Sequence, residues 1–237
     1  GCGSNSRFRA IVLSLMHAFY GPIPIYNLKK IEPQKKLRGI GISDSSTYAK
    51  ILGEKFDYVN THFHCEPHLD IEDSLSYAPY KPIDFILCSD VIEHTLLPPS
   101  EVIPKIYDAL QPGGILILCA PTYELDAHIE KYPTLENFTV ESTGEGFKVV
   151  YTSKLGILGE DANPFFHGGP GRVLELRLIS NSGLLANLIS VGFEVSTIDT
   201  VLQKKYGAWW PEQRERNDIT SLSIGYPFIC KKTTTFS

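Results

Sequence analysis

The sequence lacks the long apolar segment that a membrane helix requires. None of its apolar runs approaches the roughly 20 residues that cross a bilayer, and its start has no secretory signal pattern. Hydrophobic residues still make up 43% of the 237 residues, which is enough for an ordinary core and atypical of a disordered chain. We therefore expect a substantial globular domain without a membrane partner.

A basic surface and a disulfide framework are also missing. The formal net charge is −5, and short lysine pairs such as Lys204-Lys205 are typical of a solvated surface, so no nucleic-acid partner is expected. The five cysteines are an odd number, which fits reduced thiols in a cytoplasmic protein better than a set of disulfides. The sequence also contains no internal repeat.

The segment from Ile83 to Thr122 predicts a strand, a loop, a helix, a turn and a second strand. Ile83–Cys88 is a nearly unbroken apolar run, as expected of a parallel strand covered on both faces. Ser89-Asp90 follows at its carboxyl end, where open α/β sheets bind ligands. Pro112-Gly113-Gly114 is expected to end the helix. This pattern favours a nucleotide-type ligand site.

An earlier segment predicts a second strand–helix unit. Leu37–Asp44 is expected to be a strand and its turn, followed by a helix over Tyr48–Phe56 and a strand over Phe56–Phe63. A glycine-rich turn before a helix lets a ligand approach the backbone closely, and the helix N-terminus offers free N–H donors. The sequence lacks G-x-G-x-x-G and an acid at the end of the second strand, which disfavours a Rossmann-type oxidoreductase.

Together these motifs resemble class I S-adenosylmethionine (SAM)-dependent methyltransferases, in particular the group called methyltransferase type 11/12. The residues that carry the resemblance are Ile83-Asp84-Phe85, Val91-Ile92-Glu93-His94 and Pro112-Gly113-Gly114. It extends from about Leu37 to Thr122. The resemblance implies an α/β, Rossmann-like sheet of seven strands in the order 3-2-1-4-5-7-6, with the last strand antiparallel and helices on both faces. It also implies an enzyme, a methyltransferase that uses SAM.

In the family, an acidic residue and one spacer residue precede the sequence G-x-G-x-G. Aligned with that pattern, the glycine-rich motif of this chain is degenerate. Gly39 takes the position of the acid that holds the methionine amino group, and Asp44 is a candidate replacement. The resemblance implies that SAM lies over the turn, with its ribose and adenine near the ends of the next two strands. The residues expected to contact it are Gly39, Gly41, Ser43, Asp44, Asn60, Thr61, Asp70, Ile71, Ser89 and Asp90.

Methyl transfer from a sulfonium is an in-line displacement, so most of the catalysis is positioning, with deprotonation of the acceptor where needed. Candidate bases are Asp90, His94, His128 and His167. The FHGGPG segment around His167 loosely resembles methyltransferases found alongside sugar-modifying enzymes. The expected partner is therefore a small-molecule acceptor, polar or saccharide, methylated on oxygen.

Two alternatives remain open. Asp90, Glu93 and His94 would fall on adjacent turns if residues 90–94 were helical, and the spacing resembles the divalent-metal cluster of some O-methyltransferases. The missing acids equally suit a non-catalytic SAM- or nucleotide-binding protein whose site has decayed.

The chain is predicted to form a single methyltransferase domain, 1–237. An N-terminal helix and connector occupy 1–36, the SAM-binding core 37–122, acceptor-side insertions and later strands 123–215, and the last strand 216–237. Late strands are expected over Phe193–Val201 and Ser221–Lys231. Arg7, in the first turn of the N-terminal helix, is either solvated or a ligand contact. Glu175 and Arg177 are one strand period apart, so we expect them to pair with each other or to line the cleft.

Overall fold

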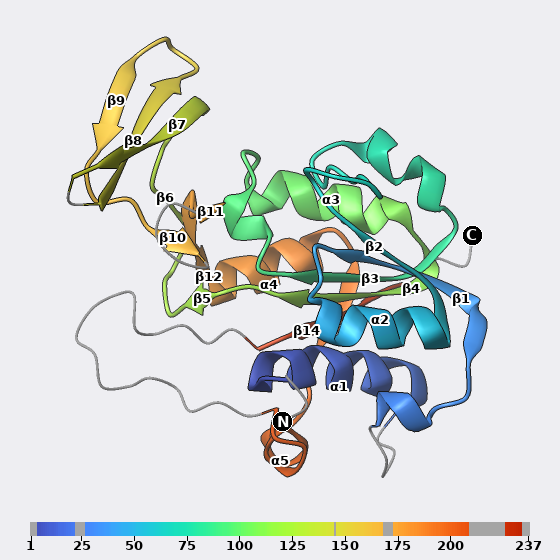
Figure 1. The fold of residues 1–237 in the computed structure, drawn as a ribbon. Coiled ribbons are helices and arrows are strands. Elements are labelled where there is room, and N and C mark those ends of the chain that lie inside the picture. Colours follow the sequence, from blue (N-terminus) through green and yellow to red (C-terminus); the bar gives the residue numbers. More distant parts are fainter. Residues whose placement is uncertain (1–3, 22–26, 145, 168–172, 209–225, 234–237) are drawn as a thin grey trace.

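The computed structural model describes residues 4–21, 27–144, 146–167, 173–208 and 226–233. Its central sheet has six strands in the order β13-β14-β4-β3-β1-β2 (Figure 1). Strands β1 to β4 are parallel, and β14 runs antiparallel to both β4 and β13. The strands are β1 Gln34–Ile42, β2 Phe56–Thr61, β3 Ile83–Ser89, β4 Leu110–Cys119, β13 Phe193–Ser196 and β14 Phe228–Lys232.

This arrangement confirms an α/β fold with a mixed sheet and helices on both faces. The predicted parallel pairing of Leu37–Ile42 with Ile83–Cys88 is confirmed, because Gly39 lies opposite Phe85 and Ile42 opposite Cys88. In the numbering of the predicted order, the observed strands are 2-1-4-5-7-6. The last strand is antiparallel, as predicted.

The predicted third strand is not formed, so the seven-stranded prediction is wrong here. Leu69–Ile71 leads instead into a turn and the 3₁₀-helix η2, Ser74–Tyr80, and only an isolated bridge joins His62 to His68. The backbone N–H of Asp70 donates to the Ser76 hydroxyl at 2.8 Å, and the Asp70 carboxylate accepts from the N–H of Glu72. These local bonds satisfy groups that a strand ladder would otherwise use.

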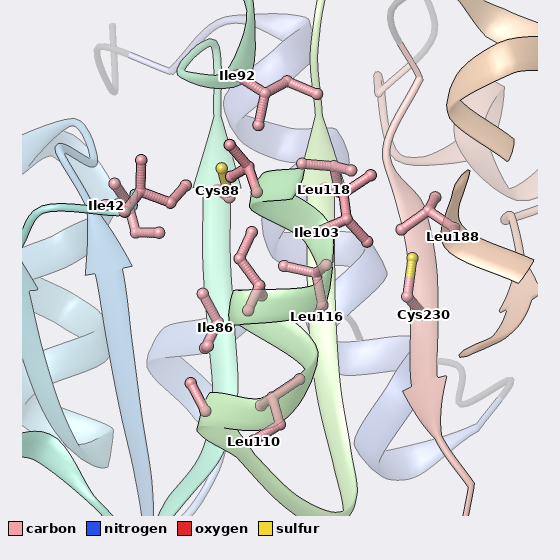
Figure 2. Close-up of a cluster of buried hydrophobic side chains, with 14 of the residues drawn as sticks. Ile42, Ile86, Cys88, Ile92, Ile103, Leu110, Leu116, Leu118, Leu188 and Cys230 are labelled. Atoms are coloured by element: carbon pink, nitrogen blue, oxygen red, sulfur yellow. The ribbon is translucent and has the colours of Figure 1, made fainter. Parts of the chain in front are cut away.

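Two layers of helices cover the sheet. One layer contains α1 (Ser6–Tyr20), α2 (Ser46–Lys55) and α5 (Thr200–Lys205), and the other contains α3 (Pro99–Ala109) and α4 (Asn181–Ser190). Because side chains alternate along a strand, β3 serves both cores. Its Phe85 and Leu87 belong to the core with α1 and α2. Its Ile86 and Cys88 belong to the core with α3 and α4, where Ile103 and Leu188 also lie (Figure 2).

Helix boundaries follow the capping residues. Asn5 caps α1 by accepting from the N–H of Phe8, and Ser45 caps α2 by accepting from the N–H of Thr47. Gly21 ends α1 with φ +67°. No helix in the described ranges is long and apolar enough to cross a membrane.

The Pro112-Gly113-Gly114 segment does not end a helix. Helix α3 already ends at Ala109, and the three residues lie inside β4. Between its pairings with Ile83 and Phe85, β4 shifts register. Proline has no N–H to give to a ladder, which is why it is tolerated at such an irregularity.

Short strands after β4 form three small sheets. Strand β12 (Arg177–Ser180) lies between β5 (Thr122–Tyr123) and β6 (Ile129–Glu130). Strands β7 (Leu135–Thr143), β8 (Gly146–Ser153) and β9 (Leu158–Asp161) form an antiparallel sheet that stands apart from the central one in Figure 1. Strand β10 (Phe166–His167) pairs with β11 (Val173–Leu174). We call these β5 to β12 elements the accessory strands; they follow the carboxyl end of β4.

The last elements are shorter than predicted. The strand expected over Phe193–Val201 ends at Ser196, because Asp199 caps α5 by accepting from the N–H groups of Val201 and Leu202. Of the strand expected over Ser221–Lys231, β14 covers Phe228 onward, and 221–225 lie outside the described residues. The tryptophans, Cys2 and the glycines after His167 also lie outside them.

We predict that Gly39→Ala destabilises the fold by roughly 1–3 kcal/mol, because its Cβ would collide with the Phe85 ring in a strand buried between two layers. The urea midpoint of unfolding should fall, and Gly39→Ala with Phe85→Leu should recover part of the loss. Gly53→Ala is the matched control, since Gly53 lies in α2 with open space around it and should gain about 0.5–1 kcal/mol. Equal effects at both glycines would contradict the packing argument.

Candidate functional site

The carboxyl ends of β1 and β3 form the switch point of the sheet. Strand β1 pairs with β2 on one side and with β3 on the other. The chain therefore passes from β1 to β2 on one side of β1 and then crosses from β2 to β3 on the other side. Ligands of open α/β sheets bind in the crevice at such a point. The turns there contain Ser43 with φ +59° and Asp90 with φ +55°. Left-handed backbone is uncommon for residues other than glycine and occurs often at functional sites.

Asp44 is the buried carboxylate at the end of β1. Only 6% of the residue is exposed, and its carboxylate accepts hydrogen bonds from the hydroxyls of Tyr48, at 2.6 Å, and Tyr58. Burial raises the pKa of Asp44 to about 7, although the two tyrosine hydrogen bonds act in the opposite direction. Burial and the Asp44 charge raise the pKa of both tyrosines, so their hydroxyls remain protonated donors.

Asn60, a predicted ribose contact, holds the backbone of Asp44. Its Oδ1 accepts from the N–H of Asp44, and its Nδ2 donates to the Asp44 carbonyl, both at 2.9 Å. Thr61 is fully buried, and its hydroxyl donates to the Gly41 carbonyl at 2.8 Å. Both side chains therefore bind the chain itself and fix the turn after β1.

The glycines of β1 make room for neighbouring side chains. A Cβ on Gly41 would collide with the Tyr58 hydroxyl and the Asp44 carboxylate, and one on Gly39 would collide with Phe85. Substitution at either position therefore disturbs packing, as well as any ligand above the turn. The predicted adenine contacts Asp70 and Ile71 lie in the turn before η2, where Ile71 is buried and Asp70 is partly exposed.

The end of β3 is closed by the first turn of α1. The Arg7 guanidinium forms an ion pair with the Asp90 carboxylate at 2.5 Å, and the Ser89 hydroxyl donates to the same carboxylate at 3.2 Å. The ring of Phe8 packs edge-on against Tyr48, with 5.4 Å between ring centroids. Arg7 therefore brings a positive charge to the strand ends, between the turns that carry Asp44 and Asp90.

The helix over residues 90–94, on which the metal alternative depended, is not formed. Asp90 is left-handed, and the 3₁₀-helix η3 covers only Ile92–His94, so Asp90 does not share a helical face with Glu93 and His94. In the described parts of the chain, no three or more His, Cys, Asp or Glu side chains are grouped to hold a metal ion. The proposed metal cluster therefore lacks the geometry on which it depended.

His94 is the candidate base nearest to Asp90 along the chain. Its Nδ1 lies 2.8 Å from the Leu174 carbonyl, so it donates to that oxygen. Its Nε2 lies 3.5 Å from Oε1 of Glu93, which is 1% exposed. The hydrogen bond of Nδ1 thus orients the ring, and it places Nε2 beside the Glu93 carboxylate.

The other candidate histidines lie in the accessory strands or just before them. His128, which follows β5, has both ring nitrogens engaged, since Nδ1 accepts from the N–H of Ser180 and Nε2 lies 3.0 Å from Oδ1 of Asn187. It therefore holds the start of α4. The backbone of His167 lies in β10, opposite Val173.

Glu175 and Arg177 do not pair with each other. Arg177 is 2% exposed and donates from Nε to Glu130 at 2.7 Å, and from Nη1 to the carbonyls of Ile92 and Thr95. Glu175 lies 3.8 Å from the Lys131 ammonium. Sequence spacing could not predict these partners, because most of them lie far from Arg177 along the chain. Arg177 holds the loop that follows η3.

Comparisons with known proteins give structural neighbours only. No family model matches the sequence, and no curated protein matches it. Among solved structures, DesVI of Streptomyces venezuelae has a TM-score of 0.48 at 8% identity, covering 98% of this chain and 93% of that one. A SAM-dependent methyltransferase of Clostridium acetobutylicum has a TM-score of 0.45 at 11% identity, with coverage of 83% and 84%.

A third neighbour is the 1,6-didemethyltoxoflavin-N1-methyltransferase of Burkholderia thailandensis, solved with S-adenosylhomocysteine. Its TM-score is 0.40 at 12% identity, and the alignment covers 95% of this chain and 79% of that one. The fold of this chain is defined by its own strand order and by the two helical layers.

We predict that Asp44→Asn changes the pH dependence of stability. The Asp44 carboxyl titrates near 3.8 when unfolded and near 7 when folded, so the folded state binds more protons between these values and its stability declines as pH rises from about 4 to 7. The stability difference between Asp44→Asn and the parent should grow by roughly 2–3 kcal/mol in favour of the variant between pH 5 and 8.

Urea unfolding at both pH values measures this difference. Asp108→Asn, on the exposed surface of α3, is the matched control and should show no such change. A pH-independent difference for Asp44→Asn would contradict the burial argument.

Proposed function

We propose that this chain is a SAM-dependent methyltransferase whose cofactor site is the crevice at the ends of β1 and β3. The observation that carries the proposal is the charge pattern there. Two carboxylates, Asp44 and Asp90, lie in the turns at the switch point, and Arg7 approaches from α1. SAM contains an ammonium, a sulfonium and a carboxylate, so a site with two acidic side chains and one guanidinium offers a partner to each of these groups.

The same pattern disfavours a dinucleotide. The pyrophosphate of NAD would approach two carboxylates, where dinucleotide-binding folds use a glycine-rich turn and the N-terminus of a helix. The sequence lacks G-x-G-x-x-G at this turn. Charge complementarity therefore favours a zwitterionic cofactor with a cationic centre over an anionic one.

Bound SAM would supply an electrophilic methyl group. The residues of this chain would orient it, exclude water and remove a proton from the acceptor where required. Asp90 ends β3 and is held by Ser89 and Arg7, so its carboxylate has a fixed position. His94 is oriented by Leu174 and Glu93 and is the base we favour, with Asp90 and His167 as further candidates.

For the acceptor we propose a small polar molecule, with O-methylation of a saccharide as the specific candidate. The support is the sequence resemblance around His167 and the position of the accessory strands after β4, beside the strand ends. The alternative is a non-catalytic SAM- or nucleotide-binding protein. It is favoured by the side chains of Asn60 and Thr61, which bind the chain itself where the family has a ribose-binding acid.

Calorimetric titration with SAM, S-adenosylhomocysteine and NADH tests the cofactor. We expect the two S-adenosyl compounds to bind and NADH not to bind. Asp90→Asn should weaken SAM binding roughly 10- to 100-fold, the effect of removing a charge-assisted partner. Asp108→Asn should leave it unchanged.

Binding of NADH without SAM would reject the methyltransferase proposal in favour of an oxidoreductase. Binding of SAM with no methyl transfer to any hydroxyl acceptor in a broad panel would favour the non-catalytic alternative. If SAM affinity is equal in the parent and Asp90→Asn, the cofactor lies elsewhere.

A further inference from the structure

A cavity of about 190 Å³ lies between the loop after η3 and the accessory strands. Its walls come from Leu96 in that loop, from Glu130 in β6, from the start of β7 and the end of β8, and from Arg177 in β12. Neither Asp44 nor Asp90 is among its lining residues, so it is distinct from the proposed cofactor site at the strand ends. The volume is below the roughly 300–1,000 Å³ of pockets that hold drug-sized ligands, so an occupant must be small.

The lining carries a net positive charge. Arg177 and Glu130 form an ion pair at 2.7 Å and largely neutralise each other. Lys154 also lines the cavity, and among the described residues its ammonium has no hydrogen-bond or ion-pair partner. One positive charge therefore remains on a wall of the cavity, which favours an anionic occupant.

Arg177 also retains hydrogen-bonding capacity toward a ligand. Its Nε and Nη1 make bonds of 2.7–3.0 Å to Glu130, Ile92 and Thr95. Its Nη2 carries two hydrogens, and its one acceptor in the described structure is the Leu96 carbonyl at 3.4 Å, a long contact. A side chain that is 2% exposed therefore keeps a donor for which the described chain offers no short bond.

The remaining walls are largely apolar. Leu135 and Leu176 are 8% and 3% exposed, and Leu96 lies at the loop side of the cavity. Apolar walls with a few convergent polar groups are the usual composition of a small-molecule site. The occupant that suits this lining has an apolar ring or chain and one anionic group.

We propose that this cavity binds a small organic carboxylate, whose apolar body contacts Leu135 and Leu176 and whose anionic group binds the Lys154 ammonium and Nη2 of Arg177. The loop that Arg177 holds follows directly from Asp90 and η3. The cavity would also anchor an acidic acceptor, holding its carboxylate beside the strand ends. This role rests on the proposed methyl transfer. Binding of the carboxylate itself does not depend on that role.

Three ring compounds of similar size and different charge test the proposal: benzoate, benzyl alcohol and benzylamine. Titrations followed by the NMR signals of each compound should give benzoate a dissociation constant on the order of 1 mM, as expected for so few atoms. Benzyl alcohol and benzylamine should bind at least tenfold more weakly.

The variants use exposed lysines that are expected to leave the fold intact. Lys154→Met should weaken benzoate binding at least tenfold, and Lys50→Met, on the exposed face of α2, should not change it. Tightest binding of benzylamine would mean that the Glu130 carboxylate dominates, and the proposal would be wrong. It would also be overturned by benzoate binding that is equal in Lys154→Met and the parent, or absent at concentrations on the order of 10 mM.

SAM titration of the same samples separates this inference from the proposed function. Lys154→Met should leave SAM affinity unchanged, since Lys154 does not contact the strand-end turns. Benzoate binding that depends on Lys154, together with no SAM binding, supports the cavity site and rejects the methyltransferase. SAM binding without benzoate binding supports the proposed methyltransferase and rejects the cavity site.

Discussion

The close approach of neighbouring strands over the glycines of β1 is the constraint on which the rest of the site depends. Phe85 fills the space above Gly39, and Tyr58 and Asp44 fill the space above Gly41. Phe85 and Tyr58 stack on one another with 6.0 Å between ring centroids. These rings occupy one face of β1, and the turn after the strand places the Asp44 carboxylate on the same face, where it accepts from the hydroxyls of Tyr48 and Tyr58.

Electrostatics connects a second turn, the one after β3, to the N-terminal helix. Asp44 is anchored by two tyrosine hydroxyls and by Asn60, while Asp90 is anchored by Arg7. The helix α1 packs on the core that contains Phe85, so its position is set by the same rings. One packed layer thus determines where both carboxylates and their counter-charge lie, although they come from three separate parts of the chain.

The parallel core was predictable from the sequence because its signals are local. Apolar runs such as Ile83–Cys88 specify buried strands, and Ser45 and Asn5 specify helix starts. The absence of the third strand was not predictable, since the bonds of Asp70 with Ser76 and Glu72 compete with a ladder on equal terms. The left-handed backbone of Asp90 was also not predictable, because an Asp in the sequence does not mark this conformation. It prevents Asp90 from sharing a helical face with Glu93 and His94.

The carbonyl partners of Arg177 could not be predicted for a different reason. They belong to Ile92 in η3 and Thr95 just after it, more than 80 positions earlier, and spacing arguments reach only neighbours on one element. This separation has a consequence for folding. The core strands β1 to β4 are complete once residue 119 has been made, but the loop after η3 receives its buried guanidinium only when β12 exists. Closing so long a segment costs chain entropy. The ligand-facing loop therefore acquires its final shape after strands β1 to β4, and a chain ending near residue 122 would contain these four strands while leaving that loop unanchored.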